Sequence, residues 1–174
     1  NGWRDTVECL ESLAAVTYPN SVAVVVDNGS TDESVTVLSE RFPDVALLET
    51  GSNLGFPGGC NVGIEWSLEH GADYVLLLNN DTLVDRDFLS HLVEVAEAHG
   101  AAVIGSVTRD LYGRLLSAGK SFPRQLFQGH TMPWLGDSAE SWHADEVDGC
   151  AMMVAKDLLT RRFAAFGCYL DPGL

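Results

Sequence analysis

The amino-acid sequence predicts an α/β fold, in which a mostly parallel sheet carries helices on both of its faces. Short apolar runs rich in Val and Leu, such as residues 22–26 and 74–78, alternate with segments of helical periodicity. Apolar runs of this length are typical of strands buried on both faces, as in parallel sheets. The 174 residues, of which 46% are hydrophobic and 20% charged, have the composition of one globular domain.

The first part of the chain supplies the most regular elements. Apolar residues recur at helical spacing from Trp3 onwards, and residues 30–33 have the form of a capping box that opens a second helix. Pro57 suits the first turn of a third helix, which stops at Gly71, and Gly100 closes a fourth. Together the patterns predict helices at residues 3–15, 30–41, 57–70 and 85–100, and strands at residues 22–26, 45–48, 74–78 and 101–104.

After residue 104 the regular alternation ends. The pattern at residues 111–116 predicts a hairpin or a pair of short strands. Further along, the pattern predicts a strand at residues 147–155 and a helix at residues 156–163. Residues 121–143 are rich in Pro, Gly, Trp and His without a period, which is typical of a functional or mobile loop. No apolar run reaches the roughly 18 residues of a membrane span, and no signal peptide is visible.

The start of the predicted sheet is anomalous. The chain opens on a helix, although such a helix is expected as the crossover between two strands of a right-handed βαβ unit. We therefore expect a strand before Asn1, and interpret the sequence as a fragment that lacks its first strand. The absent strand is expected beside the strand at residues 74–78.

Charge and cysteine usage narrow the class of function. The formal net charge is −15 and the isoelectric point about 4.4, which opposes unspecific binding to nucleic acid or to anionic lipid. An acidic protein that binds a polyanion must compensate locally for the charge repulsion, either with a metal ion or with oriented backbone N–H groups. The four cysteines lack zinc-ligand spacing, and we interpret them as thiols in a reducing compartment.

Three polar clusters follow predicted strands, at the ends where ligands of α/β sheets bind. The first, residues 27–32, contains Gly29, which permits a sharp turn and exposes backbone N–H groups. Its carboxylates suit a nucleobase edge or ribose hydroxyls, although an ordinary turn with a good helix cap has the same pattern. The third, residues 79–81, ends in Asp81, which suits the binding of a metal, a phosphate-bound metal or a ribose hydroxyl as well as it suits a turn cap.

The second cluster, residues 53–63, places glycines at the start of the third helix, where a backbone can approach a ligand closely. It is neither a P-loop nor a dinucleotide-binding G-x-G-x-x-G motif. Close packing of the helix on the sheet would by itself explain Gly59 and Gly63.

In this order and spacing, the clusters resemble those of the inverting family-two glycosyltransferases of the GT-A fold, notably the rhamnosyltransferase-like branch. The family's Asp-x-Gly-Ser-x-Asp turn is matched by residues 27–32, and its Asn-x-Gly-Phe-x-x-Gly-x-Asn segment by residues 53–61. Residues 79–81 stand at an Asp-x-Asp-type metal motif, of which they retain only the last carboxylate. The resemblance includes residues 147–154 and, near the end, Gly167, Tyr169 and Asp171.

The resemblance implies one glycosyltransferase domain over residues 1–174, incomplete at both ends. It would transfer a sugar, with inversion, from a nucleotide-diphosphate donor to an acceptor hydroxyl. Asp81 would hold Mg²⁺ or Mn²⁺ against the leaving diphosphate, with weak metal binding in the absence of nucleotide. Asp27 would contact the base, assisted by Asp32 or Asn53. The implied nucleotide-sugar-binding residues are Asp27, Asn28, Gly29, Ser30, Asp32, Asn53, Gly55, Phe56, Gly58, Gly59, Asn61, Asn79 and Asn80.

The general base is expected beyond the last residue, in a Glu-Asp pair that the family carries there, and without it this chain would be inactive. Asp148 is the candidate within the chain, but it better suits a turn beside an acceptor-binding Gly149. Trp134, Trp142 and His143 suit either stacking on an acceptor sugar or anchoring of their own loop.

Two other classes of protein stay open. A glycosyltransferase-like domain could hold a nucleotide sugar without transferring it, and a nucleotidyltransferase also combines an α/β sheet with a metal-binding carboxylate. The second class would carry a basic Gly-rich loop near its start, which this sequence lacks. Family analogy favours dTDP-rhamnose or a UDP-sugar as donor and a bacterial cell-surface glycan or lipid-linked acceptor, with no nucleic-acid partner. It implies a cytoplasmic protein, bound peripherally to the inner face of the membrane through segments outside this chain.

Overall fold

The computed structural model describes residues 1–121, 130, 131, 144 and 146–171. The described helices are α1 Trp3–Ala14, α2 Ser34–Arg41, α3 Gly55–Glu69, α4 Phe88–His99 and α5 Lys156–Phe166. The described strands are β1 Val24–Asp27, β2 Ala46–Glu49, β3 Tyr74–Leu78, β4 Val103–Gly105, β5 Thr108–Arg109, β6 Leu115–Ser117, β7 Lys120–Ser121, β8 His130–Thr131 and β9 Ala151–Ala155.

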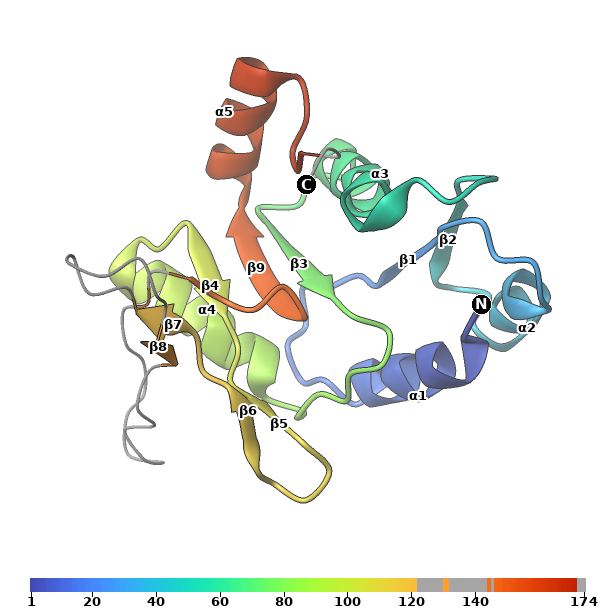
Figure 1. Cartoon of the computed structure of the whole chain (residues 1–174), viewed down its shortest axis with the longest axis horizontal. Helices are drawn as coiled ribbons and strands as arrows, with labels where there is room; N and C mark the ends of the chain where they lie inside the picture. Colours follow the sequence, from blue (N-terminus) through green and yellow to red (C-terminus); the bar gives the residue numbers. More distant parts are fainter. Residues whose placement is uncertain (122–129, 132–143, 145, 172–174) are drawn as a thin grey trace.

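The central strands form a layer in two parts (Figure 1). β1 pairs with β2 in parallel, whereas β9 lies between β3 and β4 and runs antiparallel to both. Because β3 and β4 both run against β9, they are parallel to each other. The predicted α/β class is confirmed, but the strand pairing is mixed. Among the described residues only β1 and β2 pair in parallel, whereas β3 and β4 each pair antiparallel with β9.

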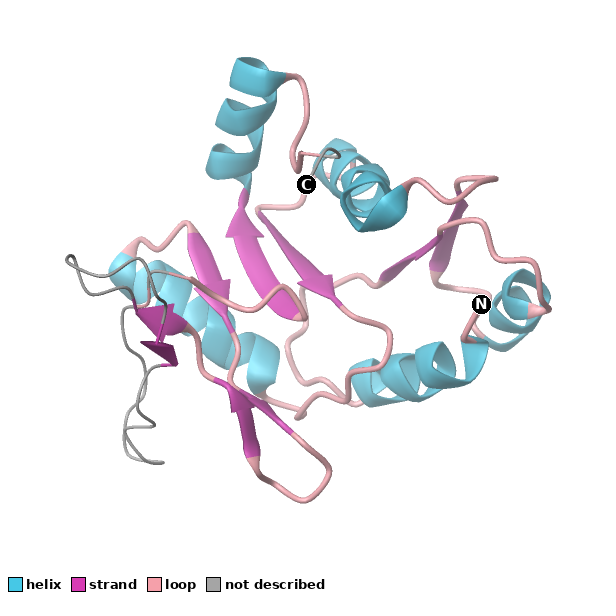
Figure 2. Ribbon diagram, viewed as in Figure 1, coloured by secondary structure: helices cyan, strands magenta, loops and turns pink. Residues whose placement is uncertain are grey.

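Helices cover both faces of this layer (Figure 2). On one face, Ile64 of α3 and Leu159 of α5 pack against Val75 and Leu77 of β3. On the other face, α4 packs against β4 and β9, while α1 and α2 share a cluster with β1 and β2. Successive residues of a strand therefore meet a helix on either side, which explains the apolar runs without polar interruption.

The layer is open between β1 and β3. Within the described residues β1 pairs only with β2 and β3 only with β9, so the edges that face each other have no strand partner. A cavity of about 1750 Å³ is lined by residues 24–27 of β1 and residues 74–78 of β3. Helix α3 packs on both strands and covers one face of the opening. The opening lies beside β3, where the sequence predicts an absent strand.

The predicted capping box at residues 30–33 is wrong. The backbone N–H of Ser30 donates to Asp27 Oδ2 at 2.9 Å, which keeps Ser30 in the turn after β1. Helix α2 begins only at Ser34, whose backbone N–H donates to Asp32 Oδ1 at 3.1 Å. The Ser34 hydroxyl also donates to this carboxylate, and these hydrogen bonds lower the pKa of Asp32. The N-cap of α2 is therefore Glu33, and Asp32, the residue before it, accepts the hydrogen bonds of Ser34.

Later elements follow the predicted order with altered bounds. α4 begins at Phe88 instead of residue 85, and the strand predicted at residues 147–155 is limited to β9. A hairpin is present as predicted, with β5 and β6 paired antiparallel, but its first strand lies before the predicted residues 111–116, and residues 110–114 connect the two strands. Most of the irregular stretch at residues 121–143, with Trp134, Trp142 and His143, lies outside the described residues. None of the described helices has the length and apolar character needed to cross a bilayer.

Candidate functional site

The first polar cluster is a tight turn built on Asp27. This residue ends β1 and is 8% exposed. Besides the bond from Ser30, its backbone carbonyl accepts the N–H of Thr50 at 3.0 Å, which continues the β1–β2 pairing. The turn-forming role left open for this cluster is therefore confirmed. The binding role stays a prediction, and it concerns a carboxylate that the turn holds in one orientation.

Asn28 joins the first cluster to the second. Its Nδ2 donates to the carbonyl of Gly55 at 2.9 Å and to Asn53 Oδ1 at 3.3 Å, and its Oδ1 accepts the N–H of Leu54 at 2.9 Å. A Cβ on Gly59 would lie 3.1 Å from Nδ2 of Asn28, so a larger residue there would have to displace this amide by a few tenths of an ångström. The two clusters thus form one unit, in which Asn28 shapes the loop before α3.

Gly29 is where this unit leaves least room. Its φ is +81°, and a Cβ there would lie 2.6 Å from the backbone carbon of Ser52. Gly51 has a similar φ of +72° but no atom within 4 Å of its Cβ position, so it provides a matched control. We expect Gly29→Ala to lower the free energy of unfolding by roughly 3 kcal/mol and Gly51→Ala by about 1 kcal/mol. Urea unfolding followed by circular dichroism measures both, and equal costs would contradict the close approach.

The third cluster is held between α1 and the residue before β9. The N–H of Asn79 donates to the carbonyl of Cys150 at 2.9 Å, and Asn80 Nδ2 donates to Thr6 Oγ1 at 3.0 Å. Asp81 is exposed. Burial raises the pKa of the Cys9 thiol in α1, and the negative charge of Asp81 raises it further, against a backbone hydrogen bond from Thr82. Asp81 therefore adds negative potential to this end of the cavity.

The first two residues of the chain connect the first and third clusters. The amino group of Asn1 donates to Ser30 Oγ, and Asn1 Oδ1 accepts the N–H of Thr31 at 2.9 Å. A Cβ on Gly2 would lie 3.7 Å from Nδ2 of Asn80. The carboxyl ends of β1 and β3 therefore meet at residues 1 and 2.

The large cavity reaches this shared edge, and it brings together many of the predicted site residues. Those that line it are Asp27, Asn28, Ser30, Phe56, Gly59, Asn79, Asn80 and Asp81. Those that do not are Gly29, Asp32, Asn53, Gly55, Gly58, Asn61 and Asp148. Part of the predicted nucleotide-binding set and the predicted metal ligand Asp81 thus share one cavity, and Asn28, which lines it, bonds to Asn53 and Gly55.

Asn61 has a partner at the other end of the chain. Its Oδ1 accepts the N–H of Leu170 at 2.7 Å, and its Nδ2 donates to the carbonyl of the same residue at 2.8 Å. The amide therefore anchors the segment after α5 to α3. Its predicted contact with a nucleotide sugar stays a prediction.

Asp148 lies near the edge that carries Asp81. The antiparallel register places Ala151 opposite Leu78, so the residues before β9 lie where β3 ends. Asp148 is half-buried two residues before Cys150, which accepts the N–H of Asn79. This position allows a role beside a bound acceptor, and the base function of Asp148 stays a prediction.

The donor set fits a cation that is shared with a phosphate. Among the described residues no group of three His, Cys, Asp or Glu side chains could hold a metal ion. At the cavity, Asp81 offers one carboxylate, with the amides of Asn79 and Asn80 beside it in sequence. Mg²⁺ usually keeps several waters and binds through one or two carboxylates plus substrate phosphates. The residues present suit that arrangement and not a cage made of protein alone.

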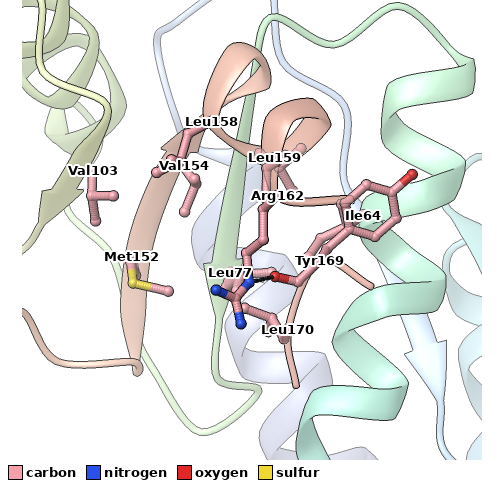
Figure 3. Close-up of a pocket in the computed structure, with 11 residues that line it drawn as sticks. Ile64, Leu77, Val103, Met152, Val154, Leu158, Leu159, Arg162, Tyr169 and Leu170 are labelled. Carbon is pink, nitrogen blue, oxygen red and sulfur yellow. Dashed lines mark hydrogen bonds between the residues drawn. The ribbon is translucent and has the colours of Figure 1, made fainter. Parts of the chain in front are cut away.

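A second, smaller cavity of about 210 Å³ is apolar (Figure 3). It lies among α3, β3, β9, α5 and the segment after α5, and its lining includes Ile64, Leu77 and Met152. The guanidinium of Arg162 points toward the backbone of Tyr169 and donates to its carbonyl. None of the predicted site residues lines this cavity, so the chemistry is assigned to the polar edge.

Several residues of the site were missed from the sequence. Thr6, Thr50 and Cys9 hold or influence the clusters from other elements, and no local pattern marks them. Asn1 had a usable signal, because a polar residue that directly follows an expected strand has the same position as Asp27 and Asn79.

Fold and site together define an α/β protein with three polar turns at one carboxyl edge of its sheet, beside a large cavity. The model of the family described as glycosyl transferase family 2 matches residues 1–159. The chain belongs to this family, as the motifs predict.

Curated relatives carry the names of sugar transferases. Over 129 residues the chain is 29% identical to the N-acetylglucosaminyl-diphospho-decaprenol L-rhamnosyltransferase of Mycobacterium tuberculosis, which covers 69% of this chain and 42% of that protein. Over 94 residues it is 29% identical to the dTDP-rhamnosyl transferase RfbF of Shigella flexneri, which covers 52% of this chain and 30% of that protein. The matches thus span less than half the length of either relative.

Solved structures share the fold. S. aureus TarS 1-349 superposes with a TM-score of 0.65 at 20% identity, covering 93% of this chain and 46% of that one. The same TarS segment in complex with UDP gives a TM-score of 0.56 at 24% identity, covering 66% of this chain and 34% of that one. With the family match, these likenesses confirm the predicted GT-A-like fold.

Proposed function

We propose that this chain is the donor-binding part of an inverting glycosyltransferase that moves a sugar from a nucleotide diphosphate to an acceptor hydroxyl. One observation carries the proposal: the polar turns after β1 and β3 meet at one cavity in a chain of glycosyl transferase family 2. Family membership also argues against the nucleotidyltransferase that the sequence left open.

Each part of the site has a role in this proposal. Asp27, fixed by its turn, accepts hydrogen bonds from the base. Asn28 holds the loop at residues 53–55 before α3, and this loop lies beside the nucleoside. Asp81, with Asn79 and Asn80, lies toward the diphosphate and is the residue that would hold Mg²⁺ or Mn²⁺. When bound, such an ion supplies charge neutralisation for the leaving diphosphate. The chain has a formal net charge of −15 and only ten Lys and Arg residues, so it has few cations of its own for that purpose.

The names of the relatives support the choice of substrates. Two relatives are named as rhamnosyltransferases, one of them with dTDP in its name and the other with a diphospho-decaprenol acceptor. A structural neighbour was solved in complex with UDP. The proposed donor is therefore dTDP-rhamnose or a UDP-sugar, and the acceptor a bacterial cell-surface glycan or its lipid-linked precursor. With a lipid-linked acceptor, the proposed location of the reaction is the cytoplasmic face of a membrane.

Calorimetry tests donor binding directly. We expect dTDP or UDP to bind this chain in the presence of Mn²⁺, at least tenfold more tightly than in its absence, because the protein offers few ligands without the diphosphate. Failure of both nucleotides to bind with Mn²⁺ would contradict the proposed site.

A transfer assay separates the enzyme from a binding module that never transfers the sugar. The chain is compared with a longer form of the protein that includes the expected Glu-Asp pair. Turnover by the longer form alone places the base outside this chain. Turnover by the chain itself, lost in Asp148→Asn, assigns the base to Asp148. Nucleotide binding without turnover in either form supports the binding module.

A further inference from the structure

The β5–β6 hairpin presents apolar side chains to solvent. Leu111 and Tyr112, in the turn between the strands, are 90% and 86% exposed, and Leu116 on β6 is 62% exposed. Figure 1 shows the hairpin projecting from the body of the molecule, away from the layer of central strands. Exposed apolar groups that gather on one protruding element indicate an interaction surface.

A network of hydrogen bonds fixes the turn that carries these side chains. Asp110 Oδ1 accepts the N–H groups of Tyr112 and Arg114, both at 2.9 Å, and Arg114 Nε donates to Asp110 Oδ2 at 2.6 Å. Burial alone would raise the pKa of Asp110, but these hydrogen bonds outweigh it and lower the pKa. Arg109 adds a bond to the carbonyl of Gly113 at 3.1 Å. The backbone that carries Leu111 and Tyr112 is therefore ordered before binding, which lowers the conformational entropy that docking costs.

Charge around the hairpin has the opposite sign to that of the chain. Within the hairpin, residues 108–117, two basic residues, Arg109 and Arg114, accompany one acidic residue, Asp110, whereas the whole chain has 25 acidic and ten basic residues. At physiological salt, charges more than about 8 Å away are largely screened, so the acidic remainder repels an approaching anion only weakly. The repulsion expected from the net charge of −15 therefore does not extend to this segment.

The hairpin also lies on the functional side of the sheet. It follows directly after β4, and β4 is parallel to β3 because both run against β9. The hairpin therefore leaves the sheet at the carboxyl edge, where β3 leads to Asp81. A surface that binds the hairpin would face the same edge as the candidate site.

We propose that the β5–β6 hairpin docks this chain on an anionic lipid bilayer, with Leu111 and Tyr112 inserted at the level of the headgroups. An apolar tip with an aromatic ring and flanking arginines matches the interfacial zone, where Tyr is enriched and basic residues meet anionic lipid. In this position the bilayer presents lipid-linked molecules to the carboxyl edge. Lipid binding itself needs no donor, so it is independent of the proposed transfer reaction.

Vesicle co-sedimentation without nucleotide or metal tests the inference. The chain is mixed with vesicles of phosphatidylcholine alone, or of phosphatidylcholine with phosphatidylglycerol. We expect binding to the anionic vesicles to exceed that to the neutral ones and to weaken as salt is raised. The double variant Leu111→Ser/Tyr112→Ser should bind the anionic vesicles at least about tenfold more weakly, because it loses the inserted side chains. It keeps the hydrogen bonds of Asp110, so the turn itself should be unchanged.

The control removes two exposed apolar side chains elsewhere, in Val22→Ser/Phe166→Ser, at positions that are 78% and 71% exposed. Its vesicle binding should equal that of the unchanged chain, and all three proteins should show the same urea midpoint. Equal binding by the tip variant, an equal loss in the control, or no binding by the unchanged chain would overturn the proposal. Self-association that the tip variant abolishes, without vesicle binding, would also overturn it and assign the hairpin to contact between copies. Nucleotide calorimetry on the tip variant should be unaffected, which separates this inference from the proposed function.

Discussion

Replacement of Asp81 by Asn is expected to weaken nucleotide binding in the presence of Mn²⁺ at least tenfold, about 1.4 kcal/mol or more, and to remove its dependence on the cation. Asp81 is the carboxylate at the β3 end of the cavity, and an amide is a much poorer ligand for a hard cation. Because Asp81 is exposed, the change should leave the urea midpoint of the chain unaltered. Calorimetry with dTDP and UDP, with and without Mn²⁺, measures the effect.

Two matched variants make this result specific. Asp44→Asn removes an exposed carboxylate from the turn before β2, at the opposite edge of the sheet, and should bind nucleotide normally. Asp27→Asn should weaken nucleotide binding with or without the cation, since Asp27 is proposed to contact the base. Unchanged, cation-dependent binding by Asp81→Asn would disprove the assignment of the metal to this residue.

Addition of an extended apolar segment before Asn1 is expected to raise the free energy of unfolding by about 3 kcal/mol or more. The open edges of β1 and β3 line one cavity, and α3 already covers one of its faces. Asn1 lies at the carboxyl ends of both strands, so a segment joined to it would run parallel to both. Burial of each Val or Ile contributes roughly 1.5–3 kcal/mol, against about 1–2 kcal/mol for ordering each backbone unit.

Thermal unfolding tests this expectation with a segment of about six residues rich in Val and Ile, since β3 has five residues. The midpoint should rise by roughly 6–12 °C, and the amides on the open edges of β1 and β3 should exchange hydrogen more slowly. A control segment of equal length with Pro at alternate positions lacks the backbone N–H donors that strand pairing needs. It should change neither the midpoint of thermal unfolding nor the hydrogen-exchange rates. Similar midpoints and exchange rates for the two segments would show that the opening does not accept a strand.

The sequence predicted correctly those elements that are determined by residues close together in the chain, and failed where contacts between distant residues decide. β3 was predicted at its observed bounds because all five of its residues are apolar and both of its faces meet helices. The capping box failed because two groups compete for one donor, and Asp27, which is outside the four-residue pattern, takes the N–H of Ser30. A strand at residues 147–155 was predicted, but its antiparallel direction depends on its pairing with β3 and β4, which are distant in sequence and which no periodicity encodes.

The same distinction applies to the candidate site. Gly and Asn in turns after strands are visible in sequence, so Asp27, Asn79 and Asp81 were found together. The use of Asn28 as a clamp on the next loop is not visible, because its partners lie more than twenty residues away. Chemical type and strand position predicted several side chains that the fold brings to one cavity, whereas the division between binding and structural roles depends on tertiary contacts.

The bond pair between Asn61 and Leu170 has a consequence for the order of folding. It joins residues 109 positions apart, and closure of such a long loop costs entropy before any contact compensates for it. We expect α3 to dock on β1 and β3 first and the segment after α5 to join last. During synthesis, the turn at residues 27–32 and the loop before α3, which Asn28 joins, would then form before the carboxyl-terminal segment attaches. This part of the candidate donor site is thus expected to belong to the early folding unit of the chain, whereas Asn79 gains its bond to Cys150 later.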